Sequence, residues 1–526
     1  MGIYLNPSNE MFQKAVRSKI YVDKTGLISY TNSVLRTTQE YICVSRPRRF
    51  GKTMAANMLS AYYSRGNDSR ALFDNFIIAG DESYETHLNR YNVIFLNMQS
   101  FLSVTGSIEA MINRIRNKVL KEIKKAFPDV IFDDTDYFAD SLENAYEAGI
   151  SPFVFIIDEW DCIFREFREN KEAQAVYLDF LRNLLKDRVY VALAYMTGIL
   201  PIKKYGSHSA LNMFDEFSMS NAGELAEYVG FTQNEVMSLC ERFRMDYDEM
   251  SRWYNGYRFK GIPAVYSPRS VVSALLRGVY DDYWNKTESY EALKIYIEMN
   301  LDGLKDIIIQ LLAGGRKEIN IGGFQNDMVT FQTYDDVLAL LIHLGYLAYD
   351  FDAKEVFIPN KEIADEFVTS VKDARWVEVV KALNSSNELL EATWNGDEKA
   401  VAEIVESVHN ETAILTYNNE TALSYTVSLA YFNAREYYTI VREMPSGKGF
   451  ADLIFLPRKN HPDKPALIVE LKWDLSAETA IRQIKDKNYP DALKDCGSRI
   501  LLVGISYNRE TKEHECMIEQ HQACFN

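Results

Sequence analysis

The N-terminal part of the chain alternates short apolar runs with longer segments in which apolar residues recur at helical spacing. The apolar runs predict buried strands near residues 41–44, 93–96, 154–157 and 189–194. Strands that alternate with helices predict a doubly wound α/β domain over about residues 15–210. One predicted helix of this domain carries on a single face Ile108, Met111, Ile112, Ile115, Val119 and Ile123.

The pattern changes after this domain. Residues from about 215 to 320 are mostly helical in their spacing, and we expect them to form a lid on the α/β core. In the next segment, Thr333 and Asp336 are expected to cap a helix that Gly345 ends, and a hairpin follows. Helix and hairpin together predict a winged-helix-like module. Its turn carries three acids and one lysine, which would repel phosphate, so packing between domains is favoured over nucleic-acid contact.

The C-terminal segment combines helix and strand in another order. The pattern predicts a helix at 420–434, strands at 437–442, 450–456 and 466–473, a helix at 477–487 and a strand at 500–505. We therefore expect an α/β domain at 1–212, a helical lid at 213–325, a winged-helix-like module at 326–375 and an αβββαβ domain at 376–526. A chain of 526 residues has room for this number of domains.

Composition places the chain among ordinary globular proteins, with 47% hydrophobic and 25% charged residues. No apolar run approaches the roughly 20 residues that span a bilayer, and the N-terminus lacks the pattern of a signal peptide. The six cysteines are scattered without a paired metal-binding spacing. These features predict a cytoplasmic protein with reduced thiols and no membrane association.

The net charge of −17 argues against a protein that coats nucleic acid by bulk attraction. A local basic groove on an acidic body stays compatible with that charge.

Residues 46–53 lie between a predicted strand and a predicted helix, where a phosphate-binding loop belongs. Gly51 allows a tight turn that directs backbone N–H groups at a phosphate. Lys52 would reach the β- and γ-phosphates, and Thr53 would bind Mg²⁺. The alternative is an ordinary turn with solvated basic residues, since arginine stands where the usual motif begins with glycine. The expected nucleotide contacts are Arg46, Arg48, Arg49, Phe50, Gly51, Lys52 and Thr53.

Two further strands of the α/β domain end in polar residues. Asp158 and Glu159 follow an apolar run, at the strand end where open α/β sheets bind ligands. Asp158 is expected to hold Mg²⁺, and Glu159 to polarise the water that attacks the γ-phosphate. Thr197, after the next strand, is a candidate sensor of that phosphate. The alternative is a strand that stops at a solvated turn.

A second set of charged residues interrupts the apolar strands of the C-terminal domain. Glu470 and Lys472 are two apart, so they project from the same face of one strand, and Asp452 begins another. Buried charges are costly unless they are paired or bound to metal. Asp452 and Glu470 would hold Mg²⁺ or Mn²⁺, and Lys472 would orient or deprotonate the attacking water. The alternative is a Glu–Lys pair on a solvent-facing sheet.

With these motifs in order, the chain resembles the bacterial proteins that join an AAA-ATPase-like domain to a C-terminal PD-(D/E)XK nuclease-like domain. The resemblance covers nearly the whole length, and in that family the arginine-rich loop is the usual form. It rests on the segments 21–25, 46–53, 157–161, 197–200, 230–232, 254–257, 266–268, 419–421, 447–452 and 470–472.

The resemblance implies a role for each matching residue. Lys52, Thr53, Asp158 and Glu159 take the phosphate, metal and catalytic positions of the ATPase, Asp452, Glu470 and Lys472 the nuclease triad, and Glu420 the helix acid that supplements it. Gln483 matches a polar position of several nuclease branches, and Phe450 stands where many relatives carry arginine. Candidates for an arginine finger are Arg48, Arg49 and Arg258.

We therefore expect a protein that binds and hydrolyses ATP and whose nucleotide state controls a metal-dependent nuclease. Nucleic acid is the expected partner, with DNA favoured over RNA, in defence against foreign DNA or in the processing of mobile elements. A homo-oligomer is compatible with this hypothesis. The alternative is a nucleotide-dependent switch that uses the nuclease-like domain for recognition without cleavage. The acidic hairpin turn and Phe450 favour the alternative, and the complete triad favours cleavage. A third hypothesis is an ATPase that serves only as an assembly scaffold.

Overall fold

The computed structural model describes residues 2–132, 137–202, 211–284, 290–325, 328–411, 420–446, 449–490, 493 and 499–522. The chain forms two compact units, one of residues 1–287 and 318–363 and the other of residues 288–317 and 364–526. The finer division at residues 212, 325 and 375 stays a prediction. Within the described ranges, no helix has the length and apolarity needed to cross a bilayer.

The first unit is built on a five-stranded parallel sheet with the strand order β2-β3-β4-β1-β5. Its strands are β1 (Tyr41–Ser45), β2 (Asn92–Asn97), β3 (Phe153–Asp158), β4 (Val191–Gly198) and β5 (Asp215–Phe217). The predicted strands are confirmed, but β4 runs four residues further than expected and includes Thr197. The edge strand β5 was missed because it is short, partly exposed and carries two acids.

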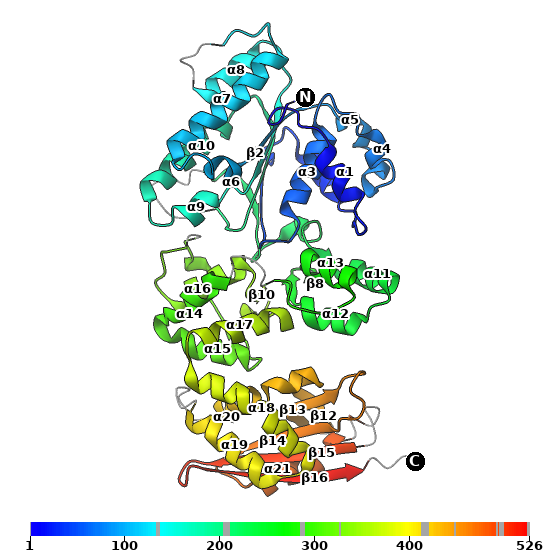
Figure 1. Ribbon diagram of the computed structural model, residues 1–526, viewed down its shortest axis with the longest axis vertical. Helices are drawn as coiled ribbons and strands as arrows, with labels where there is room; N and C mark the ends of the chain where they lie inside the picture. The colour runs from blue at the N-terminus through cyan, green and yellow to red at the C-terminus, as the bar shows by residue number, and fades with distance from the viewer. Residues whose placement is uncertain are drawn as a thin grey trace. The chain divides into compact units, whose positions relative to one another are not determined.

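Helices cover both faces of this sheet, which is why its central strands are fully apolar. Figure 1 shows α1 and α3 on one side of the sheet and α7 and α10 on the other. The predicted face of α7 is confirmed, with Ile112 only half-buried and the other five residues buried. The helices are α1 (Glu10–Val16), α2 (Gly26–Val34), α3 (Lys52–Tyr63), α4 (Arg70–Phe73), α5 (Tyr84–His87), α6 (Met98–Leu102), α7 (Ile108–Ala126), α8 (Phe138–Glu147), α9 (Cys162–Glu166) and α10 (Lys171–Leu185).

The N-terminal segment covers the outer edge of β2, which would otherwise expose unpaired backbone groups. Leu5 forms an antiparallel bridge with Ile94. The carboxylate of Glu122 on α7 accepts hydrogen bonds from the backbone N–H groups of residues 3, 4 and 5, at 3.0, 2.9 and 2.8 Å. The carboxylate of the half-buried Glu122 thus fixes the path of the N-terminus along the sheet.

The segment that follows β5 was expected to be mostly helical, but it also contains a small sheet. The sheet has the order β6-β8-β7, and a shared apolar core joins it to the helices around it. Its elements are β6 (Phe231–Thr232), α11 (Gln233–Phe243), α12 (Tyr247–Tyr254), β7 (Tyr257–Phe259), β8 (Ile262–Tyr266) and α13 (Pro268–Arg277).

The predicted helix and hairpin of residues 330–360 are confirmed. Helix α16 (Tyr334–Leu344) begins with a capping box between Thr333 and Asp336 and ends at Gly345 in a left-handed conformation, with φ 88°. Strands β10 (Ala348–Asp350) and β11 (Glu355–Phe357) pair in antiparallel fashion. Assignment of this helix and hairpin to the winged-helix class stays a prediction.

The second unit contains a five-stranded mixed sheet with the order β12-β13-β14-β15-β16. Only β14 and β15 run parallel. The predicted αβββαβ order is confirmed, with one more strand, β16, which was missed because most of its residues are polar. The elements are α14 (Tyr290–Glu298), α15 (Leu304–Leu312), α17 (Lys361–Asp373), α18 (Val377–Asn395), α19 (Glu398–Glu411), α20 (Glu420–Ala430), β12 (Tyr438–Ser446), β13 (Gly449–Pro457), β14 (Ala466–Trp473), α21 (Ala477–Asp486), β15 (Arg499–Asn508) and β16 (Glu513–Gln522).

Helix α21 packs on one face of this sheet. Ile468 of β14 and Leu502 of β15 share an apolar core with Ile481 and Ile484 of the helix. Because side chains alternate along a strand, Glu470 and Lys472 project from the face of β14 that α21 covers.

A buried carboxylate holds later parts of the first unit together. Glu362 is 1% exposed and accepts hydrogen bonds from the backbone N–H groups of Tyr283 and Trp284, at 2.7 and 2.8 Å, and from the Ser270 hydroxyl at 2.9 Å. Burial raises the pKa of Glu362 to about 8, despite these hydrogen bonds.

This pKa predicts the pH dependence of stability in the first unit. A carboxyl group with a raised pKa in the folded state contributes stability at low pH, and that stability is lost as pH rises through about 8. Between pH 5 and pH 8 we expect Glu362 to lower the free energy of unfolding by on the order of a few kcal/mol. The melting temperature of Glu362→Gln should change less with pH than that of wild type. The melting temperature of the exposed control Glu172→Gln should change with pH as in wild type. Equal slopes for Glu362→Gln and wild type would contradict the assignment.

Candidate active sites

The loop between β1 and α3 has the backbone of a phosphate-binding turn. Gly51 adopts φ 98° at the start of α3, a left-handed conformation that side chains other than glycine rarely take. No other atom lies within 4 Å of a Cβ placed there, so the requirement for glycine is conformational rather than steric. Arg49 is also left-handed, with φ 72°. The loop is therefore tightly turned where α3 begins.

Lys52 is buried at the base of this loop. Its ammonium group donates hydrogen bonds to the backbone carbonyls of Arg46 and Pro47, at 2.9 and 2.8 Å. Burial lowers the pKa of Lys52 to about 8, and the nearby Glu159, Asp161 and Asp158 oppose that shift. The lysine thus spans the loop from within, where a bound phosphate would replace the carbonyls as its partner.

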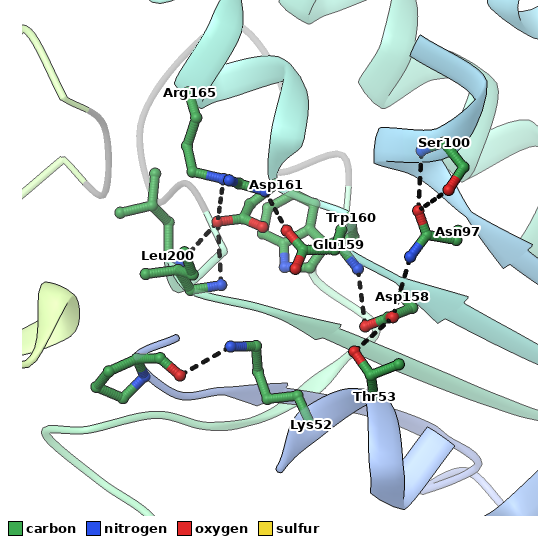
Figure 2. A network of polar contacts seen from close by, with 12 residues as sticks. Lys52, Thr53, Asn97, Ser100, Asp158, Glu159, Trp160, Asp161, Arg165 and Leu200 are labelled. Carbon is green, nitrogen blue, oxygen red and sulfur yellow. Dashed lines mark hydrogen bonds and ion pairs between the residues drawn. The ribbon is translucent and has the colours of Figure 1, made fainter. Parts of the chain in front are cut away.

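Asp158, at the end of β3, is the centre of a cluster of polar contacts (Figure 2). Its Oδ2 accepts hydrogen bonds from the Thr53 hydroxyl at 2.9 Å and from the Asn97 amide at 3.1 Å. Its Oδ1 accepts from the Glu159 backbone at 3.1 Å. The side chain is fully buried, and desolvation raises its pKa. Thr53 and Asp158 are thus in direct contact, as binding of one Mg²⁺ ion by both would require.

The backbone and the carboxylate of Glu159 are both constrained. Its backbone is left-handed, with φ 55°, and its carboxylate forms an ion pair with Arg165 of α9. The Arg165 guanidinium also lies 3.5 Å from the carboxylate of Asp161. Glu159 would have to leave Arg165 before it could orient a water molecule.

Asp161 and Asn97 were not predicted to belong to the site. Asp161 is fully buried and accepts hydrogen bonds from the backbone N–H groups of Ile199 and Leu200, at 3.0 and 2.9 Å. It therefore joins the end of β4 to Arg165 and Glu159. Asn97 lies beside Asp158 in the register of β2 and β3. Polar residues at the ends of two adjacent predicted strands were the available signal for both.

Two of the predicted nucleotide contacts, Arg46 and Phe50, need correction or qualification. The guanidinium of Arg46 is buried, donates to the carbonyls of Ser45 and Phe217, each at 2.9 Å, and stacks on a phenylalanine ring. The Arg46 N–H donates to the carbonyl of Gly198, so this backbone group is engaged within the protein. Phe50 is a core residue whose ring packs edge-on against Tyr257. The structure therefore leaves only the backbone of Phe50 for a nucleotide.

The other arginines and the candidate sensor threonine lie in the following places. Arg49 donates to the carbonyl of Tyr283, and Arg48 is half-buried. Arg258 lies 3.6 Å from Asp350 in an ion pair. The hydroxyl of Thr197 is buried without a hydrogen-bond partner among the described residues, beside Asp158 in the register of β3 and β4. Thr197 and Asn97 thus flank Asp158 from the two neighbouring strands of the sheet.

In the second unit, Asp452 and Glu470 lie side by side. They stand one step beyond the Leu453–Val469 pair of β13 and β14. The Asp452 carboxylate accepts a hydrogen bond from the Leu471 N–H at 2.7 Å. Lys472 donates to Oε1 of Glu470 at 3.0 Å. The structure therefore brings the three predicted residues together.

Glu470 is a buried carboxylate with one oxygen that has no partner among the described residues. It is 1% exposed, and burial and the charge of Asp452 raise its pKa to about 7. Gln483 and Lys472 both donate to Oε1, while Oε2 is buried without a partner among the described residues. A divalent cation between this oxygen and the half-buried Asp452 would satisfy both carboxylates.

The other predicted members of this site are less well defined. Glu420 begins α20, and its side chain lies outside the described residues, as do residues 447 and 448 of the glycine-rich turn. Phe450 is 63% exposed. Within the described ranges, no cluster of three or more His, Cys, Asp and Glu side chains is arranged to hold a metal. Two carboxylates suffice for Mg²⁺, which usually keeps several waters and substrate oxygens as ligands.

The fold and sites define an ATPase-type α/β domain with a carboxylate site on a separate mixed sheet. Residues 10–207 match the model of the family described as predicted AAA-ATPase, and residues 420–516 match that of the PD-(D/E)XK nuclease superfamily. The chain therefore joins an AAA-ATPase-like domain to a domain of the PD-(D/E)XK nuclease superfamily.

Two individual proteins are also similar. An uncharacterized protein encoded in the vnfD 5′ region of Azotobacter chroococcum mcd 1 is 22% identical over 509 residues, which cover 94% of this chain and 93% of that one. The ORC2 protein of Aeropyrum pernix, solved as ADPNP–ADP complexes, is 12% identical with a TM-score of 0.32, over 71% of this chain and 99% of that one.

The contacts of Asp161 predict its effect on stability. Asp161→Asn can keep an oxygen that accepts from Ile199 and Leu200, but it removes the carboxylate charge beside the Arg165 side chain, which is 9% exposed, so we expect a loss of about 2–4 kcal/mol in the free energy of unfolding. Thermal and urea unfolding would measure it. The matched control Asp179→Asn removes an exposed partner at 3.9 Å and should cost less than about 0.5 kcal/mol. An equal effect of the two substitutions would rule out the bracing role of Asp161.

Proposed function

We propose that this protein binds and hydrolyses ATP and that its nucleotide state controls a metal-dependent nuclease acting on nucleic acid. The observation that carries the proposal is the presence in one chain of two separate acidic sites. One combines Lys52, Thr53 and Asp158, and the other combines a buried Glu470 with its neighbours. A cytoplasmic location, a DNA substrate rather than RNA, and a role in defence or mobile-element processing belong to the proposal.

At the first site, Thr53 and Asp158 would hold Mg²⁺, which neutralises phosphate charge. Lys52 would exchange the carbonyls of its own loop for phosphate oxygens. Glu159 would orient the attacking water once its carboxylate leaves Arg165. Released from that pair, Arg165 would keep its contact with Asp161.

At the second site, Asp452 and Glu470 would hold Mg²⁺ or Mn²⁺, which lowers the pKa of a bound water. Lys472 lies on the same face of β14 and would orient that water or steady the charge that develops on the phosphate. Gln483 would keep Glu470 in place. Glu420 is proposed as a supplementary acid.

A second candidate function is recognition of nucleic acid without cleavage. The exposed Phe450 favours it, because a phenyl ring cannot neutralise phosphate. The experiments below separate the two functions.

For the ATPase, we expect Glu159→Gln to reduce phosphate release by about 10²–10⁴-fold, since it removes the general base. Lys52→Ala should abolish binding of a fluorescent ATP analogue. Glu169→Gln, an exposed control in the same region, should behave as wild type. Hydrolysis that survives in Glu159→Gln would exclude this residue as the base.

For the nuclease, we expect purified protein to cleave labelled DNA with Mg²⁺ or Mn²⁺, and cleavage to change between ATP and ADP. Lys472→Met and Glu470→Gln should lower the rate by about 10²–10⁴-fold. The exposed control Glu478→Gln on α21 should not. Binding of DNA or RNA with no cleavage above an Asp452→Ala background would instead establish the recognition function.

A further inference from the structure

A cavity of about 370 Å³ lies in the first unit beside the Asp158 cluster, in the size range of small-molecule sites. It is enclosed by the N-terminal segment, α3, the end of β2, α6 and α7. None of residues 46–53 lines it, so it is separate from the proposed phosphate site. Asn97 is shared between the cavity wall and the contacts of Asp158.

One wall of the cavity is aromatic and firmly placed. The rings of Tyr4 and Phe101 pack with centroids 5.1 Å apart, and Phe95 completes the wall. The Phe95 N–H donates to the Tyr4 carbonyl at 2.9 Å. Glu122 binds the backbone N–H groups on both sides of this position. The N-terminus is thus fastened in the place where Tyr4 lines the cavity.

Several other residues that line the cavity are polar. Asn57 and Ser60 follow Thr53 along α3 at helical spacing and line the cavity. Ser60 is 4% exposed, and its hydroxyl has no hydrogen-bond partner among the described residues. Arg114 lines the cavity from an exposed position of α7 and forms no hydrogen bond or ion pair with any described residue. Burying an unpartnered hydroxyl is unfavourable, and a ligand that reached the Ser60 hydroxyl would supply the missing partner.

We propose that this cavity binds a nucleoside monophosphate, either free or as an unstacked residue of a nucleic-acid strand. A nucleobase presents a flat face to the aromatic wall. Its heteroatoms match the amide of Asn57 and the hydroxyl of Ser60. The phosphate provides a negatively charged partner for the Arg114 guanidinium, which forms no ion pair with a described residue. A hydrocarbon ligand would leave all three polar groups without partners.

The test uses isothermal titration calorimetry on the full chain saturated with Mg·ADP, so that the phosphate loop is filled. The probes are AMP, GMP, CMP and UMP, and an oligothymidylate as the strand form. We expect one equivalent of at least one probe to bind. Competition between oligonucleotide and monophosphate would identify the strand as the source, and binding of the monophosphate alone would identify the free nucleotide.

Two substitutions make the site assignment falsifiable. Arg114→Ala should weaken binding by about tenfold, whereas Lys118→Ala, exposed one turn further along α7, should not. Ser60→Ala should weaken binding and at the same time raise the melting temperature of the ligand-free protein, because it removes an unpartnered hydroxyl. The proposal is overturned if no probe binds to the ADP-saturated protein, or if binding is unchanged in both variants.

Discussion

The buried carboxylate of Asp158 is the constraint on which the first site depends. A charge at the end of a central strand is costly, and three donors surround it: a hydroxyl, a side-chain amide and a backbone N–H. Each donor comes from a different element, α3, β2 and the turn after β3. The parallel sheet brings them together because the carboxyl ends of its strands share one edge. Satisfying one carboxylate therefore fixes the geometry of the whole site.

In the second site, the buried carboxylate has fewer hydrogen-bond donors around it. Glu470 is as deeply buried as Asp158, but one of its oxygens lacks a partner among the described residues, and Asp452 adds a like charge beside it. Lysine and glutamine reach only the other oxygen. Such an arrangement is costly without a cation and favourable with one, and a fully paired structural ion pair would not leave this defect. The burial of Glu470 thus excludes a solvent-facing Glu–Lys pair and supports the proposed metal site.

How much could be predicted from sequence depended on whether a signal was local. Runs of apolar residues and their polar ends located β3 and the Asp158–Glu159 acids, and alternation placed Glu470 and Lys472 on one face. The short strands β5 to β8 and the polar edge strand β16 lacked such a signal. The burial of Arg46, and the contacts of Asn97 and Asp161, depend on residues distant in the chain. No local pattern encodes those contacts.

The arginine-rich form of the loop now has a physical explanation. Arg46 replaces the flexible first glycine with a side chain that binds the end of β5, and Arg49 binds the carbonyl of Tyr283. The N–H of Tyr283 in turn donates to Glu362. Gly345 packs so closely on Pro47 that an added Cβ would lie 2.8 Å from its ring. The loop is therefore braced by segments some 170 to 300 residues later in the chain. A phosphate that draws Lys52 from the carbonyls of Arg46 and Pro47 would alter the loop at the point where those braces attach, and the proposed binding of nucleotide would then act on the later segments of the first unit through direct contacts.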